Sequence, residues 1–172
     1  MGPAYSGRPI DAWTGRLADL PERRISKSQQ SVILLVDDDS QGRKQATRLL
    51  ERDGYLVLTA ADGQEGLEIS RQYPGSIDML IAGVRMPRLN GTDLCAHLFE
   101  ERPGIKVIFS VSAALSEFFT PFADLPCLTK PINENVLRSK VREILSDPVA
   151  TLGKPPSDPR NELGALLHRT PD

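Results

Sequence analysis

The chain has 172 residues, of which 40% are hydrophobic and 26% charged, and its formal net charge is −2. This composition is typical of a single globular domain with tails and excludes collagen-like and wholly disordered chains. The balanced charge gives no basic footprint for nucleic acid, and no apolar run approaches the ~20 residues of a membrane span. The two cysteines, Cys95 and Cys127, and two histidines are too few for a zinc site or a disulfide framework, which favours a reducing, cytoplasmic compartment.

Proline and glycine divide the chain into three regions. Residues 1–30 are predicted to form an irregular N-terminal extension, and residues 147–172 a proline-rich C-terminal tail. Proline removes a backbone donor and fixes φ, so the tail is not expected to contain a long helix or a central strand. Residues 31–146 are dense in apolar side chains and are predicted to be the folded domain.

The folded region alternates short apolar runs with amphipathic stretches. The apolar runs predict five strands, at 31–36, 55–60, 77–84, 105–111 and 125–129. Helical spacing predicts helices at 40–53, 64–72, 91–101 and 133–145, with a short segment at 113–120. This alternation predicts an α/β fold, a doubly wound five-stranded parallel sheet with about five flanking helices. In such sheets, ligands bind beyond the carboxyl ends of the strands.

Charged residues stand at the ends of three predicted strands. The first strand runs into an aspartate triplet in VILLVDDDS, the third into RMPRLNGTDL, and the fifth ends in LTKP. Together, in this order and on this frame, the three motifs resemble the receiver domain of bacterial two-component response regulators. The resemblance covers residues 31–146 and implies a flavodoxin-like fold and a signalling role in a two-component or phosphorelay pathway.

The resemblance implies roles for several of these residues. Asp37 and Asp38 fall on the acidic pair that holds Mg²⁺, a cation suited to hard carboxylate oxygens. Lys130 falls on the lysine that contacts the phosphoryl group, and the following bond to Pro131 is expected to be cis, which only X-Pro bonds adopt at low cost. Two plainer readings stay open: the aspartates cap the following helix through its dipole, and Lys130 is a solvated loop residue.

The phosphoacceptor position departs from the family pattern. The resemblance places the acceptor aspartate four residues before Pro87, where this chain has Gly83. Glycine supplies neither a nucleophile nor a carboxylate ligand. Asp78 lies five residues upstream, about 16 Å along a strand, and does not replace it. We therefore expect no phosphorylation of the usual kind, and either no cofactor or weakly bound Mg²⁺ at Asp37 and Asp38.

Two switch positions also depart from the family pattern. The family's switch hydroxyl falls on Val111, although Ser110 and Ser112 flank it, so a shift of one residue would still supply a hydroxyl. The family's rotating aromatic falls on Cys127, and a thiol in that place is expected to be buried packing.

These departures predict a signalling module rather than an enzyme. No GxSxG, GxGxxG or Walker loop supports a hydrolase, dehydrogenase or nucleotide-binding function. The module is expected to act by protein–protein interaction, independently of phosphorylation, with a histidine kinase or an output protein as partner. The alternative is a phosphotransfer protein that uses Asp37 or Asp38 as an unorthodox acceptor.

Self-association is the remaining expectation. The resemblance points to the surface of the fourth helix, fifth strand and last helix as a homodimer face. Phe118, Phe119 and Phe122 cluster near that surface. These phenylalanines equally fit plain packing against the sheet, and the sequence leaves the two readings open.

Overall fold

The structure is a computed structural model that describes residues 30–116 and 126–147. Strands and helices alternate along this part of the chain: β1 (Val32–Val36), α1 (Ser40–Arg52), β2 (Leu56–Ala60), α2 (Gly63–Gln72), β3 (Met79–Gly83), α3 (Gly91–Glu101), β4 (Lys106–Ser112), α4 (Ala113–Ser116), β5 (Cys127–Lys130) and α5 (Glu134–Ser146). The strands pair in parallel in the order β2-β1-β3-β4-β5. The predicted doubly wound α/β fold is confirmed.

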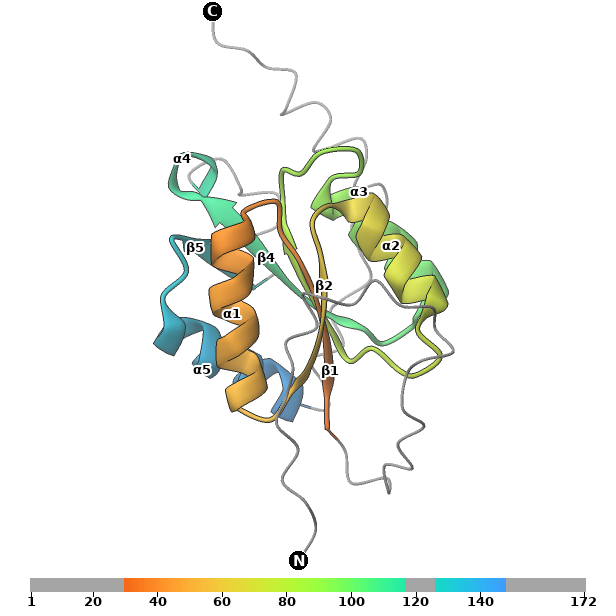
Figure 1. Cartoon of the computed structure of the whole chain (residues 1–172), viewed down its shortest axis with the longest axis horizontal. Helices are drawn as coiled ribbons and strands as arrows, with labels where there is room; N and C mark the ends of the chain where they lie inside the picture. The colour runs from red at the N-terminus through yellow and green to blue at the C-terminus, as the bar shows by residue number, and fades with distance from the viewer. Residues whose placement is uncertain (1–29, 117–125, 148–172) are drawn as a thin grey trace, which may run out of the picture.

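The sheet lies between two layers of helices. Figure 1 shows α1 and α5 on one side of the strands and α2 and α3 on the other. Alternate residues of β1 point into opposite layers: Ile33 and Leu35 pack with α1 and α5, while Leu34 and Val36 pack with α2 and α3. Because both faces are covered, the strands read as continuous apolar runs rather than as alternating ones.

Side-chain caps set where the helices begin. Asp39 caps α1 by accepting a hydrogen bond from the Gln41 amide, and Asp62, Asn90 and Asn133 cap α2, α3 and α5. Such caps satisfy backbone donors that have no partner within the helix. Of the aspartate triplet, only Asp39 serves as a cap, so the reading in which all three cap α1 is wrong.

The observed helices and strands begin and end within two residues of the predicted positions. The larger difference is the segment between β4 and β5. The predicted helical segment 113–120 is described only as the four-residue α4. Phe118, Phe119 and Phe122 lie outside the described residues, as do residues 1–29 and 148–172 of the two predicted extensions. Among the described residues, no helix has the length and hydrophobicity that crossing a bilayer requires.

Candidate functional site

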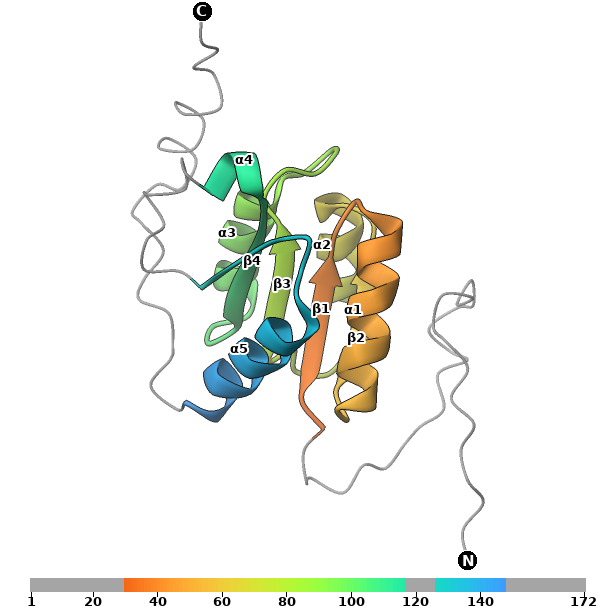
Figure 2. The ribbon, with the colours of Figure 1, turned by 90° about the vertical axis from the view of Figure 1, so that its left-hand side faces the viewer.

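The strand ends bring the predicted site residues together at one edge of the sheet. In Figure 2 the arrowheads of β1 and β3 point to the same edge. Asp37 follows β1 directly, Gly83 ends β3, and Lys130 ends β5. Gly83 is paired with Ser110 of β4 in the sheet. A β-carbon built on Gly83 would lie 3.8 Å from the Asp37 carboxyl carbon, so the two positions face each other.

Asp37 is the centre of this site. Its Oδ1 accepts hydrogen bonds from Lys130 Nζ at 2.7 Å and from the Asp39 amide at 2.9 Å. Its Oδ2 accepts one from the Ser110 hydroxyl at 3.1 Å. The side chain is only 7% exposed. A buried carboxylate is stable only when it is paired and hydrogen-bonded, and here both oxygens of Asp37 have donors within the protein. We call Asp37, Lys130, Ser110 and Gly83 the acidic pocket.

Asp38 is placed differently from its neighbour. Its carboxylate is 47% exposed, and its Oδ1 lies 4.0 Å from Lys130 Nζ, at the limit of an ion pair. At this exposure and distance, water screens most of the attraction between the two charges. The predicted acidic pair therefore consists of one buried, fully bonded carboxylate and one solvated carboxylate. Lys130 is tied to the first, so it is not a free loop lysine.

The backbone does not require glycine at position 83. The nearest atoms to a β-carbon there would be Met86 Cγ at 3.4 Å and Sδ at 3.6 Å, which are ordinary contact distances. Gly91 differs, because a β-carbon there would lie 2.1 Å from the Gly83 carbonyl oxygen. Close approach of α3 to β3 explains Gly91. At Gly83, by contrast, a side chain fits, so the glycine changes the chemistry of the site and not its backbone path.

The donor set does not fit a resident Mg²⁺ ion. Mg²⁺ prefers near-octahedral oxygen ligands and is usually anchored by carboxylates. Both oxygens of Asp37 already accept hydrogen bonds, and Gly83 contributes no carboxylate. Within residues 30–116 and 126–147, no three His, Cys, Asp or Glu side chains form a group that could hold a metal ion. Weak binding through Asp37 and Asp38 remains a prediction for solution.

Strand alternation decides what the residues of β4 contribute. Val111 points into the α2 and α3 layer and is buried there. Ser110, one residue earlier, points to the opposite face and bonds Asp37, while Ser112 is exposed. The pairing of β4 with β3 and β5 runs without a bulge through these positions. Ser110 therefore supplies the hydroxyl at the pocket, one residue before Val111, as the sequence left open, and regular strand alternation places it there without a bulge.

The two thiols lie in apolar surroundings. Cys127 is half-buried and packs against the α2 and α3 core, and burial raises its pKa. Burial also raises the pKa of Cys95 to about 12. A thiol is a nucleophile only as the thiolate, so both side chains are placed for packing. The bond between Lys130 and Pro131 is cis, as the resemblance implies.

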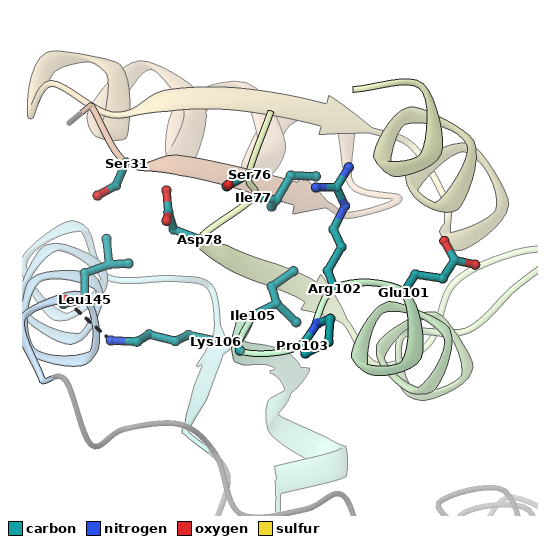
Figure 3. Close-up of a pocket in the computed structure, with 11 residues that line it drawn as sticks. Ser31, Ser76, Ile77, Asp78, Glu101, Arg102, Pro103, Ile105, Lys106 and Leu145 are labelled. Atoms are coloured by element: carbon teal, nitrogen blue, oxygen red, sulfur yellow. Dashed lines mark hydrogen bonds between the residues drawn. The ribbon is translucent and has the colours of Figure 1, made fainter. Parts of the chain in front are cut away.

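A second hollow, of about 410 Å³, lies at the opposite, amino edge of the sheet (Figure 3). Its two cations are already bound to the backbone. Arg102 donates to the carbonyls of Ser70, Tyr73 and Gly75, and Lys106 donates to carbonyls at the end of α5. The Asp78 carboxylate at its rim accepts the Val32 amide at 2.7 Å. These contacts brace α2, α3 and α5, so the hollow does not compete with the acidic pocket as the site.

Sequence reasoning missed one ion pair beside the pocket, between Arg88 after β3 and Asp62 before α2. A signal for Asp62 was present in DGQE, an Asp with Glu three residues later, which is typical of a helix start. Asp62 accepts the Glu65 amide at 3.0 Å, and Glu65 in turn accepts the Ala61 amide. Nothing in the sequence singles out Arg88 as its partner.

The chain is similar to known proteins in the region that carries this pocket. A family model described as the response regulator receiver domain matches residues 33–142. "Sensor kinase CckA" of Brucella abortus is 34% identical over 130 residues, which are 72% of this chain and 13% of the kinase. "Transcriptional regulatory protein CpxR" of Escherichia coli is 33% identical over 115 residues, which are 66% of this chain and 48% of that protein. The chain thus spans less than half the length of either relative.

A solved structure agrees with these sequence matches. The response regulator receiver domain protein from Clostridium thermocellum is 29% identical, with a TM-score of 0.59 over 67% of this chain and 94% of that chain. The family match extends from β1 into α5 and so includes every strand that contributes to the acidic pocket. The chain belongs to the response regulator receiver domain family of two-component signalling.

Proposed function

We propose that this chain is a degenerate receiver, a signalling module that acts by binding a partner protein without being phosphorylated. The observation that carries the proposal is Gly83, which faces Asp37 from the end of β3 where the family places its acceptor carboxylate. Phosphoryl transfer to a receiver needs a nucleophile at that position, and glycine has none. The module is therefore proposed to be non-enzymatic.

The remaining residues of the acidic pocket support a fixed state. Lys130 is bonded to Asp37, and Ser110 bonds the other oxygen of the same carboxylate. Each charged or polar side chain of the pocket thus has a partner within the protein, whereas the neighbouring Asp38 is solvated. The hydroxyl at the pocket, that of Ser110, already donates to Asp37, and Cys127 offers no aromatic ring that could turn inward. With the hydroxyl engaged and no such ring, we expect no conformational change of the usual kind.

The alternative, phosphotransfer at an unorthodox acceptor, is less well supported. Asp37 is buried, and its oxygens accept three hydrogen bonds that an attack on a phosphoryl donor would have to break. Asp38 is accessible, but the one cation that pairs with its carboxylate in the described part of the chain is Lys130, at 4.0 Å. If the alternative holds, Asp38 is the acceptor.

Partner and location belong to the same proposal. Membership of the receiver family supports a histidine kinase or an output protein as partner, and a cytoplasmic location is proposed with it. A homodimer through α4, β5 and α5 remains a proposal as well, because the phenylalanines that suggested it lie outside the described residues.

Intact-mass measurement after incubation with acetyl phosphate and Mg²⁺ tests the proposal. We expect no phosphoryl adduct on the 172-residue wild type and an adduct on Gly83→Asp, which shows that the donor and conditions are competent. An adduct on the wild type would overturn the proposal. Its loss in Asp38→Asn, but not in Asp37→Asn, would then establish the alternative acceptor.

A further inference from the structure

The loop between β3 and α3, residues 84–90, contains a residue in an unusual backbone conformation. Arg88 has a φ of 64°, and it is the one residue other than glycine with a positive φ among those the structure describes. The β-carbon makes this left-handed region unfavourable for most side chains. Such a conformation persists only where the surrounding structure holds it in place, so the contacts of Arg88 identify what holds it.

Arg88 is held by the residue that begins α2. Its Nε donates to Asp62 Oδ2 at 2.8 Å, and its Nη2 donates to the same oxygen. The Asp62 side chain is 9% exposed, whereas that of Arg88 is 61% exposed. The arginine therefore reaches from solvent to a buried carboxylate on a neighbouring element.

The backbone makes a second link between the same two segments. The Gly63 amide donates to the Leu89 carbonyl oxygen at 3.1 Å. A β-carbon on Gly63 would lie 2.1 Å from that oxygen, so the approach is possible only for glycine. Leu89 also packs against the α2 and α3 core. The loop is thus joined to the first turn of α2 by an ion pair, a backbone hydrogen bond and an apolar contact.

The protonation of Asp62 agrees with this arrangement. Burial by itself raises the pKa of the carboxyl group, but hydrogen bonds from Arg88 and from the Glu65 amide outweigh it, and the pKa is lowered from its ordinary value. The carboxylate is therefore charged at neutral pH, as a charge-assisted bond to arginine requires.

We infer that Arg88 and Asp62 form a clamp that holds the β3–α3 loop on the first turn of α2 in a single conformation. The clamp needs no metal or phosphoryl group, although the loop directly follows the acceptor position. It keeps the exposed residues Arg85 and Pro87 in a fixed place beside the acidic pocket. The inference goes beyond the proposed function, because the loop is held whether or not the protein is phosphorylated.

Amide hydrogen exchange of Gly63, followed by NMR in the 172-residue chain, tests the clamp. In Arg88→Gly the side chain is lost while the left-handed backbone becomes easier to adopt, and the variant Asp62→Ser, which leaves residue 88 unchanged, controls for the extra backbone freedom of glycine. We expect exchange at Gly63 to become about tenfold faster, since its protection depends on the loop staying in place. The Gly66 amide, which donates to the Asp62 carbonyl within α2, is expected to change by less than about twofold.

Asp62→Ser is the matched variant on the other side of the clamp. Serine keeps an oxygen that caps α2 but loses the charge that binds Arg88. It is expected to reproduce the faster exchange at Gly63. The clamp is refuted if either variant leaves Gly63 unchanged. It is also refuted if Gly63 and Gly66 accelerate equally, because that result would report loosening of α2 and not release of the loop.

Discussion

The acidic pocket and the Arg88–Asp62 clamp lie at the same edge of the sheet, and they differ in how far the cation of each ion pair is exposed to solvent. Each has a buried aspartate, Asp37 or Asp62, whose exposure is below 10%, and each pairs it with a cation. Lys130 is 28% exposed and Arg88 is 61% exposed. Because solvent screens an exposed pair, the pocket is expected to contribute more to stability than the clamp.

The two regions also differ in whether they lie at the place of the family's chemistry. The pocket joins β1, β4 and β5 through Asp37, Ser110 and Lys130, beside the end of β3 where the family has its acceptor position. The clamp joins a loop to a helix and includes no group placed to react. Both join a buried carboxylate to a cation on another element, Asp37 to Lys130 and Asp62 to Arg88. Under the proposed function, the pocket has a structural role because Gly83 supplies no acceptor side chain.

Removal of the pocket's central carboxylate should give the largest loss of stability. Asp37→Ala leaves the ammonium of Lys130 and the hydroxyl of Ser110 without their acceptor, and we expect a loss of about 2–3 kcal/mol. Asp38→Ala is the matched control and should change stability by less than about 0.5 kcal/mol, because that side chain is solvated. Urea unfolding of both variants measures the difference. Equal losses would show that the two acids are not divided into buried and exposed roles.

Removal of the hydroxyl beside Gly83 should have a smaller effect. Ser110→Ala leaves Asp37 Oδ2 without a donor from the protein, and we expect a loss of about 1 kcal/mol. Ser112→Ala, at an exposed position of the same strand, should stay within about 0.5 kcal/mol of wild type. A Ser110→Ala protein as stable as the wild type would mean that the hydroxyl does not help to hold the carboxylate. Chemical denaturation provides the measurement.

The smallest effect concerns the clamp and depends on pH. A carboxyl group with a lowered pKa in the folded state stabilises the protein above its unfolded value, about 3.9 for aspartate, and loses that contribution as pH falls through the lowered folded value. The pKa of Asp62 is lowered in the folded protein. The stability difference between wild type and Arg88→Gly should therefore be constant from pH 7 to 5 and shrink toward pH 3. A difference that is unchanged at pH 3 would contradict the ion pair.

Much of the fold follows from local sequence signals. The apolar runs of β1 and β3 are buried on both faces, and alternation with helices permits few arrangements other than a parallel sheet. The family resemblance implied that Asp37 and Lys130 belong to one site, although they are far apart in the chain. Spacing alone could not predict it.

Other features could not be predicted because they depend on strand phase and on contacts between elements. Counting along the fourth strand places the switch hydroxyl at Val111, but the pleat turns Ser110 toward the pocket. Whether glycine is required also depends on neighbouring atoms: Gly91 is constrained by the Gly83 carbonyl, while Gly83 has space for a side chain. The partnership of Arg88 with Asp62 depends on a left-handed residue that no sequence signal marks.

We propose that Gly83 occupies the acceptor position of a receiver that works without metal or phosphorylation. Thermal unfolding of wild type, Gly83→Ala and Gly83→Asp, with and without about 10 mM Mg²⁺, tests it most directly. Gly83→Ala controls for the added β-carbon, which the site accommodates. For a restored site with a Kd of about 1 mM, Mg²⁺ should raise the Tm of Gly83→Asp by about 4 °C and leave the other two proteins unchanged. An equal Tm shift in all three proteins would show that Gly83 is not at the acceptor position.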